Sequence, residues 1–229
     1  MKTDSPKVAW IHGYPSWVLI VSSFLWSLLS EAAIQPSGIS GDLTLDGLSD
    51  VVLMDKNGDG RILLNQGNGE LSVSATLFSR SSTLGPLAIT DLSDDGYPEI
   101  LISYPNEASL ESVWGNAYDQ GHSFILNNLS GEITSLSVSH SIPAQVAVGY
   151  AGSNPIALIG YENNSLIQTY NIAPPSLTKD LLFIDLNGDA VEELVVLCSS
   201  DTGTLVQVYQ QQAGVWSEFL LIQLADSTL

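Results

Sequence analysis

The sequence predicts an all-β fold, a β-propeller-like array of about four four-stranded blades, preceded by one N-terminal hydrophobic helix. Three observations predict this fold. A nine-residue acidic motif occurs three times, an apolar strand-like run follows each copy, and the copies are spaced at multiples of about 47 residues. A unit of that length with four short strands is typical of one propeller blade.

The acidic motif reads DLTLDGLSD from Asp42, DLSDDGYPE from Asp91 and DLNGDAVEE from Asp185. Each copy has aspartate at positions one and five, an oxygen-bearing side chain at position three, and Asp or Glu at position nine. Such crowding is repulsive without a cation and favourable with one. Side-chain oxygens at these positions, with a backbone carbonyl at position seven, form a shell of the kind that Ca²⁺ prefers. A solvated turn would explain one such loop, but three at a regular spacing favour metal binding.

The spacing of the motifs predicts a further unit without an acidic loop. The first two motifs start 49 residues apart and the last two start 94 apart, which leaves room for one more unit starting near residue 138. There the chain reads SVSHSIPAQVAVGYAG, followed by the strand-like segments PIALIGY and SLIQTYNI. This unit has kept its strands and lost its charge. In the first unit, the expected strands are ISGD, DVVLM, RILLNQ and LSVSATLF, separated by turn signals such as NGDG and GNGE.

The motif resembles the calcium loops of FG-GAP and VCBS repeat proteins, the propeller family that includes integrin α-subunits. The resemblance covers about residues 39–222, and NQGNGEL at 65–71 looks like the hairpin that closes a VCBS unit. It implies that the seventh residue of each loop offers its backbone carbonyl. The implied Ca²⁺ ligands are Asp42, Thr44, Asp46, Leu48 and Asp50 in the first loop, Asp91, Ser93, Asp95, Tyr97 and Glu99 in the second, and Asp185, Asn187, Asp189, Val191 and Glu193 in the third.

A fourth acidic stretch, DKNGDGRILLNQ at residues 55–66, follows the spacing of an EF-hand loop. Its twelfth residue is Gln66, where an EF-hand has a bidentate glutamate, and a strand-like run precedes it where an EF-hand has a helix. These departures predict a hairpin turn between two strands.

Two arrangements of the blades remain open. Only PSGIS precedes Asp42, so the first blade is thin at its start, whereas the last unit ends in the strand-like run SEFLLIQLAD. These features favour a closed four-bladed ring, in which Phe219 to Leu224 would complete the first blade. In an open array, the end blades would expose strand edges and apolar faces that dock on a partner.

Residues 1–33 are expected to be a signal peptide or a membrane anchor, and residues 34–229 the FG-GAP/VCBS-type propeller domain. The run WVLIVSSFLWSLL carries no charge, Lys2 and Lys7 precede it, and small residues follow it. The stretch from residue 14 to 33 is also about long enough to cross a bilayer. Either reading places the remaining domain on the extracytoplasmic side, secreted or anchored.

Composition restricts the function. The formal net charge of −19 argues against a nucleic-acid partner. The single cysteine, Cys198, lies in an apolar run and is expected to be a buried packing residue. No catalytic constellation is evident. We therefore expect a non-enzymatic module that binds a protein or glycan partner or belongs to a larger membrane-associated assembly. The alternative is a carbohydrate-active enzyme of propeller fold, because glycoside hydrolysis uses paired carboxylates.

Overall fold

The computed structural model describes residues 38–54, 59–79, 85–114, 123–152, 154–163, 165–201 and 203–224. These residues belong to one compact unit, Pro36–Leu229. The expected leader at residues 1–33 lies outside the described residues, so its helix stays a prediction. Within the described ranges, the structure contains no helix long and apolar enough to cross a membrane.

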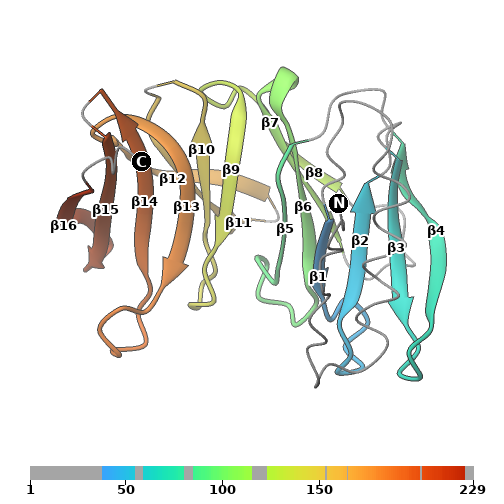
Figure 1. Cartoon of the computed structure of the whole chain (residues 1–229). Helices are drawn as coiled ribbons and strands as arrows, with labels where there is room; N and C mark the ends of the chain where they lie inside the picture. The colour runs from blue at the N-terminus through green and yellow to red at the C-terminus, as the bar shows by residue number, and fades with distance from the viewer. Residues whose placement is uncertain are drawn as a thin grey trace, which may run out of the picture. The chain divides into compact units, whose positions relative to one another are not determined.

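The described strands form four antiparallel sheets of four strands each (Figure 1), which confirms the all-β prediction. In each sheet the strands are hydrogen-bonded in their order along the chain. Sheet 1 contains β1 (Gly38–Gly41), β2 (Asp50–Met54), β3 (Asp59–Asn65) and β4 (Leu71–Ser79). Sheet 2 contains β5 (Leu87–Thr90), β6 (Glu99–Tyr104), β7 (Ser109–Trp114) and β8 (Ser123–Leu126), with a short 3₁₀ turn, η1 (Pro105–Glu107), between β6 and β7. Sheet 3 contains β9 (Ile133–Val138), β10 (Val146–Tyr150), β11 (Ile156–Glu162) and β12 (Ser165–Ile172). Sheet 4 contains β13 (Leu177–Ile184), β14 (Glu193–Ser200), β15 (Gly203–Gln212) and β16 (Val215–Leu224).

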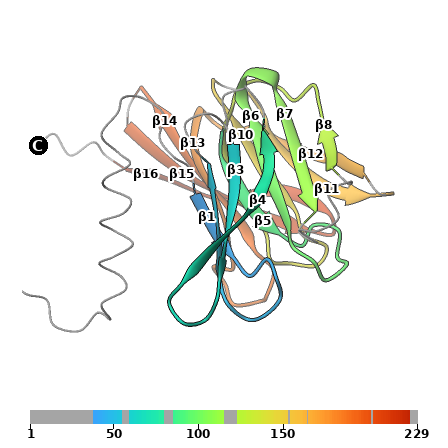
Figure 2. The same ribbon diagram turned by 90° about the vertical axis from the view of Figure 1, so that its right-hand side faces the viewer.

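The sheets pack face to face in chain order, and the first strand of each contacts the first strand of the next. Figure 2 views them from the side of sheet 1. One apolar cluster lies between each neighbouring pair, built around Val52 and Ile100 for sheets 1 and 2, Leu101 and Val148 for sheets 2 and 3, and Leu158 and Leu194 for sheets 3 and 4. Because a sheet lies on each side, every residue of β6 and β10 is buried.

The expected unit without an acidic loop is sheet 3, whose strands are all present. Between β9 and β10 the chain runs through residues 139–145, which carry no carboxylate and contain a cis peptide bond at Ile142–Pro143. The fourth acidic stretch also has the expected context, since β2 and β3 pair antiparallel around it with Met54 opposite Gly60. Residues 55–58 themselves lie outside the described residues.

The expectation that Phe219–Leu224 completes the first blade is wrong. These residues are part of β16, which pairs with β15 in sheet 4, and sheet 1 has four strands of its own. The cause is local: Ala213 and Gly214, both at positive φ, form a two-residue turn that returns the chain directly against β15. In the described strands, sheets 1 and 4 do not pack on each other as successive sheets do. Cys198 is buried in β14, as expected, and burial raises the pKa of its thiol.

Candidate metal centre

The three acidic loops occupy the same place in their sheets, between the first strand and the second. They are residues 42–49 in sheet 1, 91–98 in sheet 2 and 185–192 in sheet 4. In Figure 1 the loops after β5 and β13 lie at the lower edge, where the loop after β9 also turns. The sheet topology therefore places the three acidic loops between the first two strands of sheets 1, 2 and 4, as the sequence period predicts.

The loops share one backbone conformation. Positions four and six have positive φ in every copy: Leu45 (60°) and Gly47 (84°), Asp94 (57°) and Gly96 (87°), and Gly188 (80°) and Ala190 (65°). The carboxylate at position one accepts hydrogen bonds from the backbone N–H at position six in all three loops. The backbone N–H at position two donates to the carboxylate at position nine in all three. The repeated motif thus encodes a repeated loop and not only a repeated charge.

In the second loop, three carboxylates converge. One carboxylate oxygen from each of Asp91, Asp95 and Glu99 lies within 4.8 Å of the other two. No other cluster of three such ligand residues occurs among the described residues. Glu99 is 1% exposed at the start of β6, and the N–H groups of Leu92 and Ser93 donate to it at 2.6 and 3.3 Å. The loop therefore holds one buried and two more exposed carboxylates around one point.

The electrostatics of the second loop favour a cation. Burial raises the pKa of Glu99, and the negative charges of Asp91 and Asp95 raise it further, while the backbone N–H of Leu92 partly offsets them. The Oγ of Ser93, at position three, lies close enough to Glu99 to favour its charged form, but this buried atom makes no hydrogen bond of acceptable geometry. A buried oxygen without a partner is costly. A divalent cation bound there would take this oxygen as a ligand and offset the repulsion.

The first loop orients its carboxylates differently. Asp50, which is fully buried, uses one oxygen for the N–H of Leu43 at 3.1 Å and the other for the N–H of Asn65 in β3 at 2.9 Å. Its side chain is one methylene shorter than that of Glu99. Asp42 accepts from the N–H groups of Asp46 and Gly47. The first loop has the predicted residue types but does not gather three carboxylates as the second loop does.

The third loop places an amide between its carboxylates. The Nδ2 of Asn187 donates to Glu193 at 2.9 Å, and its Oδ1 accepts from the N–H of Asp189 at 2.8 Å. The N–H groups of Gly188 and Ala190 donate to Asp185 and lower the pKa of that carboxyl. The oxygen of Asn187 is therefore engaged within the loop, and the three acidic side chains are held apart.

The structure does not test the other predicted ligands. Thr44 lies in the first loop with an exposed side chain. The N–H groups of Leu48, Tyr97 and Val191 donate to the aspartate at position five of their loops, at 2.8, 2.9 and 2.8 Å. The predicted roles of their carbonyl groups stay predictions.

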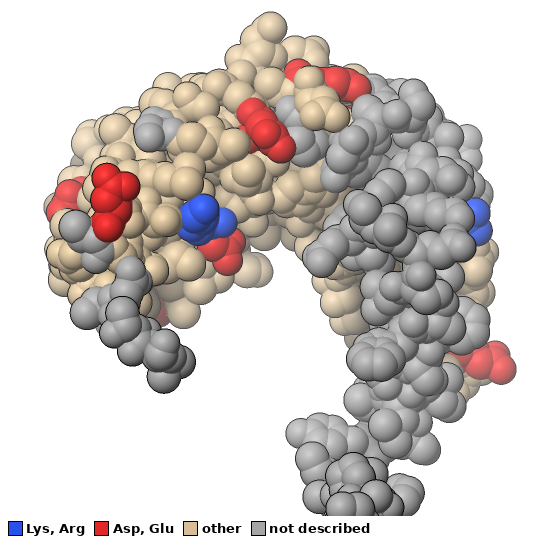
Figure 3. Space-filling model, turned by 45° about the horizontal axis from the view of Figure 1, so that its top comes forward, with Lys and Arg blue, Asp and Glu red and all other residues tan. Residues whose placement is uncertain are grey.

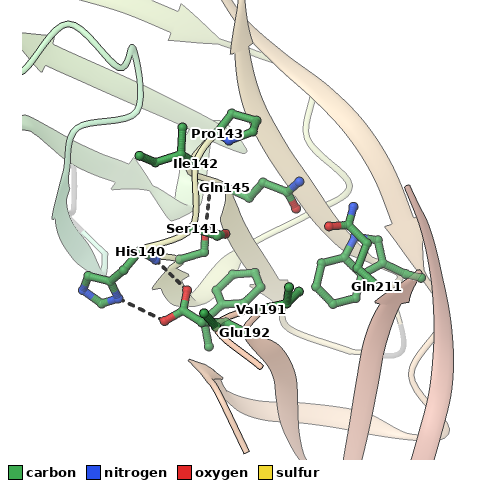
Figure 4. A pocket seen from close by; sticks show the side chains of 12 residues that line it. His140, Ser141, Ile142, Pro143, Gln145, Val191, Glu192 and Gln211 are labelled. Atoms are coloured by element: carbon green, nitrogen blue, oxygen red, sulfur yellow. Dashed lines mark hydrogen bonds and ion pairs between the residues drawn. The ribbon is translucent and has the colours of Figure 1, made fainter. Parts of the chain in front are cut away.

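Sequence reasoning missed a contact between sheets 3 and 4. Glu192, at position eight of the third loop, accepts from the N–H of His140 at 2.6 Å, and its other oxygen lies 3.2 Å from the Nδ1 of that residue (Figure 4). The two residues border a cavity of about 440 Å³ whose wall includes Gln145 and Gln211. The only sequence feature that pointed to this contact was a histidine in the loop of sheet 3 that has no carboxylate. Its partner, Glu192, is 52 residues away in the chain and could not be identified from the sequence.

The acidic surface agrees with the sequence charge. Figure 3 shows one face on which Asp and Glu side chains stand in separate groups and basic side chains are few. Within the described ranges, the only Lys and Arg residues are Arg61 and Lys179. A surface of this sign attracts cations and repels nucleic acid.

Replacing Ala190 with glycine is expected to stabilise the protein by about 1 kcal/mol, because an L-residue at positive φ is strained and glycine is not. Gly96→Ala, at the same position of the second loop, is the matched control and should destabilise by a similar amount. Urea unfolding of both variants measures the two changes. An unchanged free energy of unfolding for Ala190→Gly would show that the positive φ of Ala190 causes no backbone strain.

Comparison with known proteins agrees with this geometry. Residues 42–102 match the model of the FG-GAP-like repeat. The matched range begins directly after β1 and covers β2 to β4 of sheet 1, the first two acidic loops, β5 and most of β6. The chain thus contains an FG-GAP-like repeat at residues 42–102. No curated protein matches the sequence.

One solved structure that the chain resembles is described as the crystal structure of BBS1N in complex with ARL6DN, soaked with lead. The sequence identity is 15% and the TM-score is 0.49. The matched region covers 79% of this chain and 50% of that one, so the chain spans about half the length of that protein chain.

Proposed function

We propose that this chain is an exported, calcium-binding β-propeller-type domain that acts as a non-enzymatic binding or assembly module at a membrane or cell surface. An FG-GAP-like repeat within an all-β, propeller-like domain supports this proposal, because domains of this type generally serve as binding modules. The observation that carries the metal proposal is the second loop. There, three carboxylates converge, and the same loop holds a buried Ser93 oxygen without a hydrogen-bond partner.

Calcium would stabilise the edge of the sheet stack in this proposal. Each loop joins the first two strands of its sheet, and residues at positions one and nine lie at the ends of these strands. A cation held by both ends would fix their separation. The second loop is expected to bind most tightly because its carboxylates are already gathered, with the first and third loops binding after rearrangement of their side chains.

Calcium binding can be tested with a matched pair of variants in the second loop. Titration calorimetry on chelator-treated protein is expected to show about three Ca²⁺ per chain, the tightest of them lost in Asp95→Asn. Asp94→Asn makes the same charge change one residue earlier, at an exposed position with positive φ that asparagine tolerates, and should leave the tightest site intact. Absence of calcium binding to the wild-type chain, or equal losses in both variants, would overturn the assignment.

Export and the surface location rest on residues 1–33. A basic start followed by an uncharged 13-residue run supports secretion or anchoring. The intact mass of the natural protein distinguishes a cleaved leader, with a loss of about 32 residues, from a retained anchor. The partner we propose is a protein or glycan, since the surface charge disfavours nucleic acid.

The enzyme alternative gains no support from the cavity beside His140. Glycoside hydrolysis uses two carboxyl groups flanking one bond. The residues that line this cavity include one carboxylate, Glu192, and it is held by His140. The remaining lining is mainly apolar, hydroxyl and amide side chains.

A further inference from the structure

The middle of the sheet stack shows which residues face the neighbouring sheets. Positions are numbered from the first residue of each acidic motif, so that positions ten and twelve lie in the second strand of the sheet. Side chains at these two positions face the preceding sheet. In β6 these are Ile100 and Ile102, which pack with residues of sheet 1. Position eleven of β6, Leu101, packs with residues of sheet 3. Apolar side chains at these positions are therefore the contact surface between successive sheets.

Sheet 4 carries the same kind of surface on its far side. Leu194 and Val196, at positions ten and twelve of β14, pack toward sheet 3, so Val195 at position eleven lies on the opposite face. Register places Leu182, Val208 and Leu220 beside Val195 across all four strands. Leu182 and Leu220, on the outer strands of the sheet, are 53% and 43% exposed, whereas Val208 between them is 3% exposed. An apolar row thus crosses a sheet face on which the described residues place no further sheet.

Sheet 1 carries the complementary surface on its own far side. Val52, at position eleven of β2, packs toward sheet 2, and Val51 at position ten lies on the opposite face. Val51 is opposite Leu63, which is opposite Val73 in β4, and Val73 is 64% exposed. Among the described residues, sheets 1 and 4 therefore have outer apolar faces of the two types that meet where successive sheets of this chain pack together.

We propose that the far faces of sheet 1 and sheet 4 pack on each other between two copies of this chain, head to tail, to form an eight-bladed ring. Continuity with the packing inside the chain carries this proposal, because sheet 4 meets the sheet 1 of a second copy through the positions that join sheets 1 and 2. A head-to-tail interface closes only when the rotation permits it. Two copies of four blades give eight, which is within the range of known propellers.

The charge of the chain predicts how this association depends on salt. Each copy has a formal net charge of −19, so two copies repel at low ionic strength. The proposed interface is apolar, and salt screens the opposing charges without weakening it. Dimerisation is expected to strengthen as salt is raised from low to physiological concentration. The proposed dimer interface uses sheet faces and not the calcium loops. Failure of dimerisation is therefore distinguishable from failure of calcium binding.

Sedimentation of the full-length chain tests the proposal with three single-lysine variants. Leu182→Lys places a charge on the far face of sheet 4, and Val73→Lys on the far face of sheet 1. Leu221→Lys is the matched control, since Leu221 is 47% exposed but lies on the opposite face of β16 from Leu220. Each position is exposed, so the variants are expected to fold, which circular dichroism checks.

The wild type and Leu221→Lys are expected to sediment at twice the 24.4 kDa mass of the chain. Leu182→Lys and Val73→Lys are each expected to be monomeric, and a mixture of the two should recover a dimer, because one unmodified interface can still form. A wild type that is monomeric at every concentration would overturn the proposal. So would loss of the dimer in only one of the two face variants, or a mixture that stays monomeric.

Discussion

Replacing Glu99 with glutamine is expected to lower the melting temperature strongly in calcium and to change it little in chelator. In calcium the variant loses a charged ligand at the centre of the second loop. At a calcium concentration of 100 times the dissociation constant, binding contributes about 2.7 kcal/mol to the free energy of unfolding, and most of this would be lost. In chelator the buried charge faces Asp91 and Asp95 without a cation, so its removal costs little.

The difference in stability between wild type and Glu99→Gln is expected to depend on pH, with a sign that the pKa of Glu99 determines. The pKa of Glu99 in the folded protein lies above its ordinary value of 4.5, so the folded state keeps its proton to higher pH than the unfolded state does. Without metal, wild type should therefore lose stability relative to Glu99→Gln as pH rises through the interval that begins near 4.5. With calcium the order reverses, because protons compete with the metal and deprotonation favours binding.

Thermal unfolding in calcium and in chelator, at several pH values, measures both effects. Glu162→Gln is a suitable control, since Glu162 is an exposed glutamate at the end of β11. It should shift the melting temperature by the same small amount in both conditions. If Glu99→Gln behaves in the same way as Glu162→Gln, the second loop does not hold a cation through Glu99.

The repeat was predictable from the sequence because its signal is local and occurs several times. Apolar runs after each acidic motif predict β2, β6 and β14, and the spacing, with the strand-like runs PIALIGY and SLIQTYNI, predicts the uncharged unit that forms sheet 3. The hairpin around residues 55–58 followed from strand-like residues on both sides of an NGDG turn. In each case the residues that determine the element are neighbours in the chain.

The differences between the three loops were not predictable from the motif. Asp50 and Glu99 both satisfy position nine, but the shorter side chain is engaged by the N–H of Asn65, which is 15 residues away. Asn187 satisfies position three by composition, yet it donates to Glu193. Whether three carboxylates converge depends on one methylene group and on hydrogen bonds from another strand. A nine-residue pattern contains neither.

The arrangement of the blades was also beyond the sequence. The expected ring closure through Phe219–Leu224 relied on strand-like composition, which does not specify the neighbouring strand. The two-residue turn at Ala213 and Gly214 decides the pairing, since it brings β16 against β15 at once. A strong turn signal next to a long strand should therefore outweigh a thin first blade in sequences of this kind.

Gly149→Ala is expected to destabilise the protein by about 1–3 kcal/mol through overpacking between sheets 3 and 4. Gly149 lies in β10, opposite Ser135 in β9. A methyl group there would overlap the Oγ of Ser135 and would lie 3.1 Å from Thr178 and 3.2 Å from Leu181 in β13. Glycine at this position is therefore favoured first by Ser135 on the adjacent strand of the same sheet, and second by the close approach of β13.

A double-mutant cycle with Ser135→Ala separates the two sources of this cost. The Oγ of Ser135 is buried without a hydrogen-bond partner, so Ser135→Ala alone should be neutral or slightly stabilising. In the double variant the main overlap is gone and only the contacts with β13 remain, so the cost of Gly149→Ala should fall by at least 0.5 kcal/mol, about the lower limit of coupling between residues in contact. Urea unfolding of the four proteins measures this coupling. Strict additivity would show that β13, and not Ser135, limits how closely sheets 3 and 4 can pack at this point.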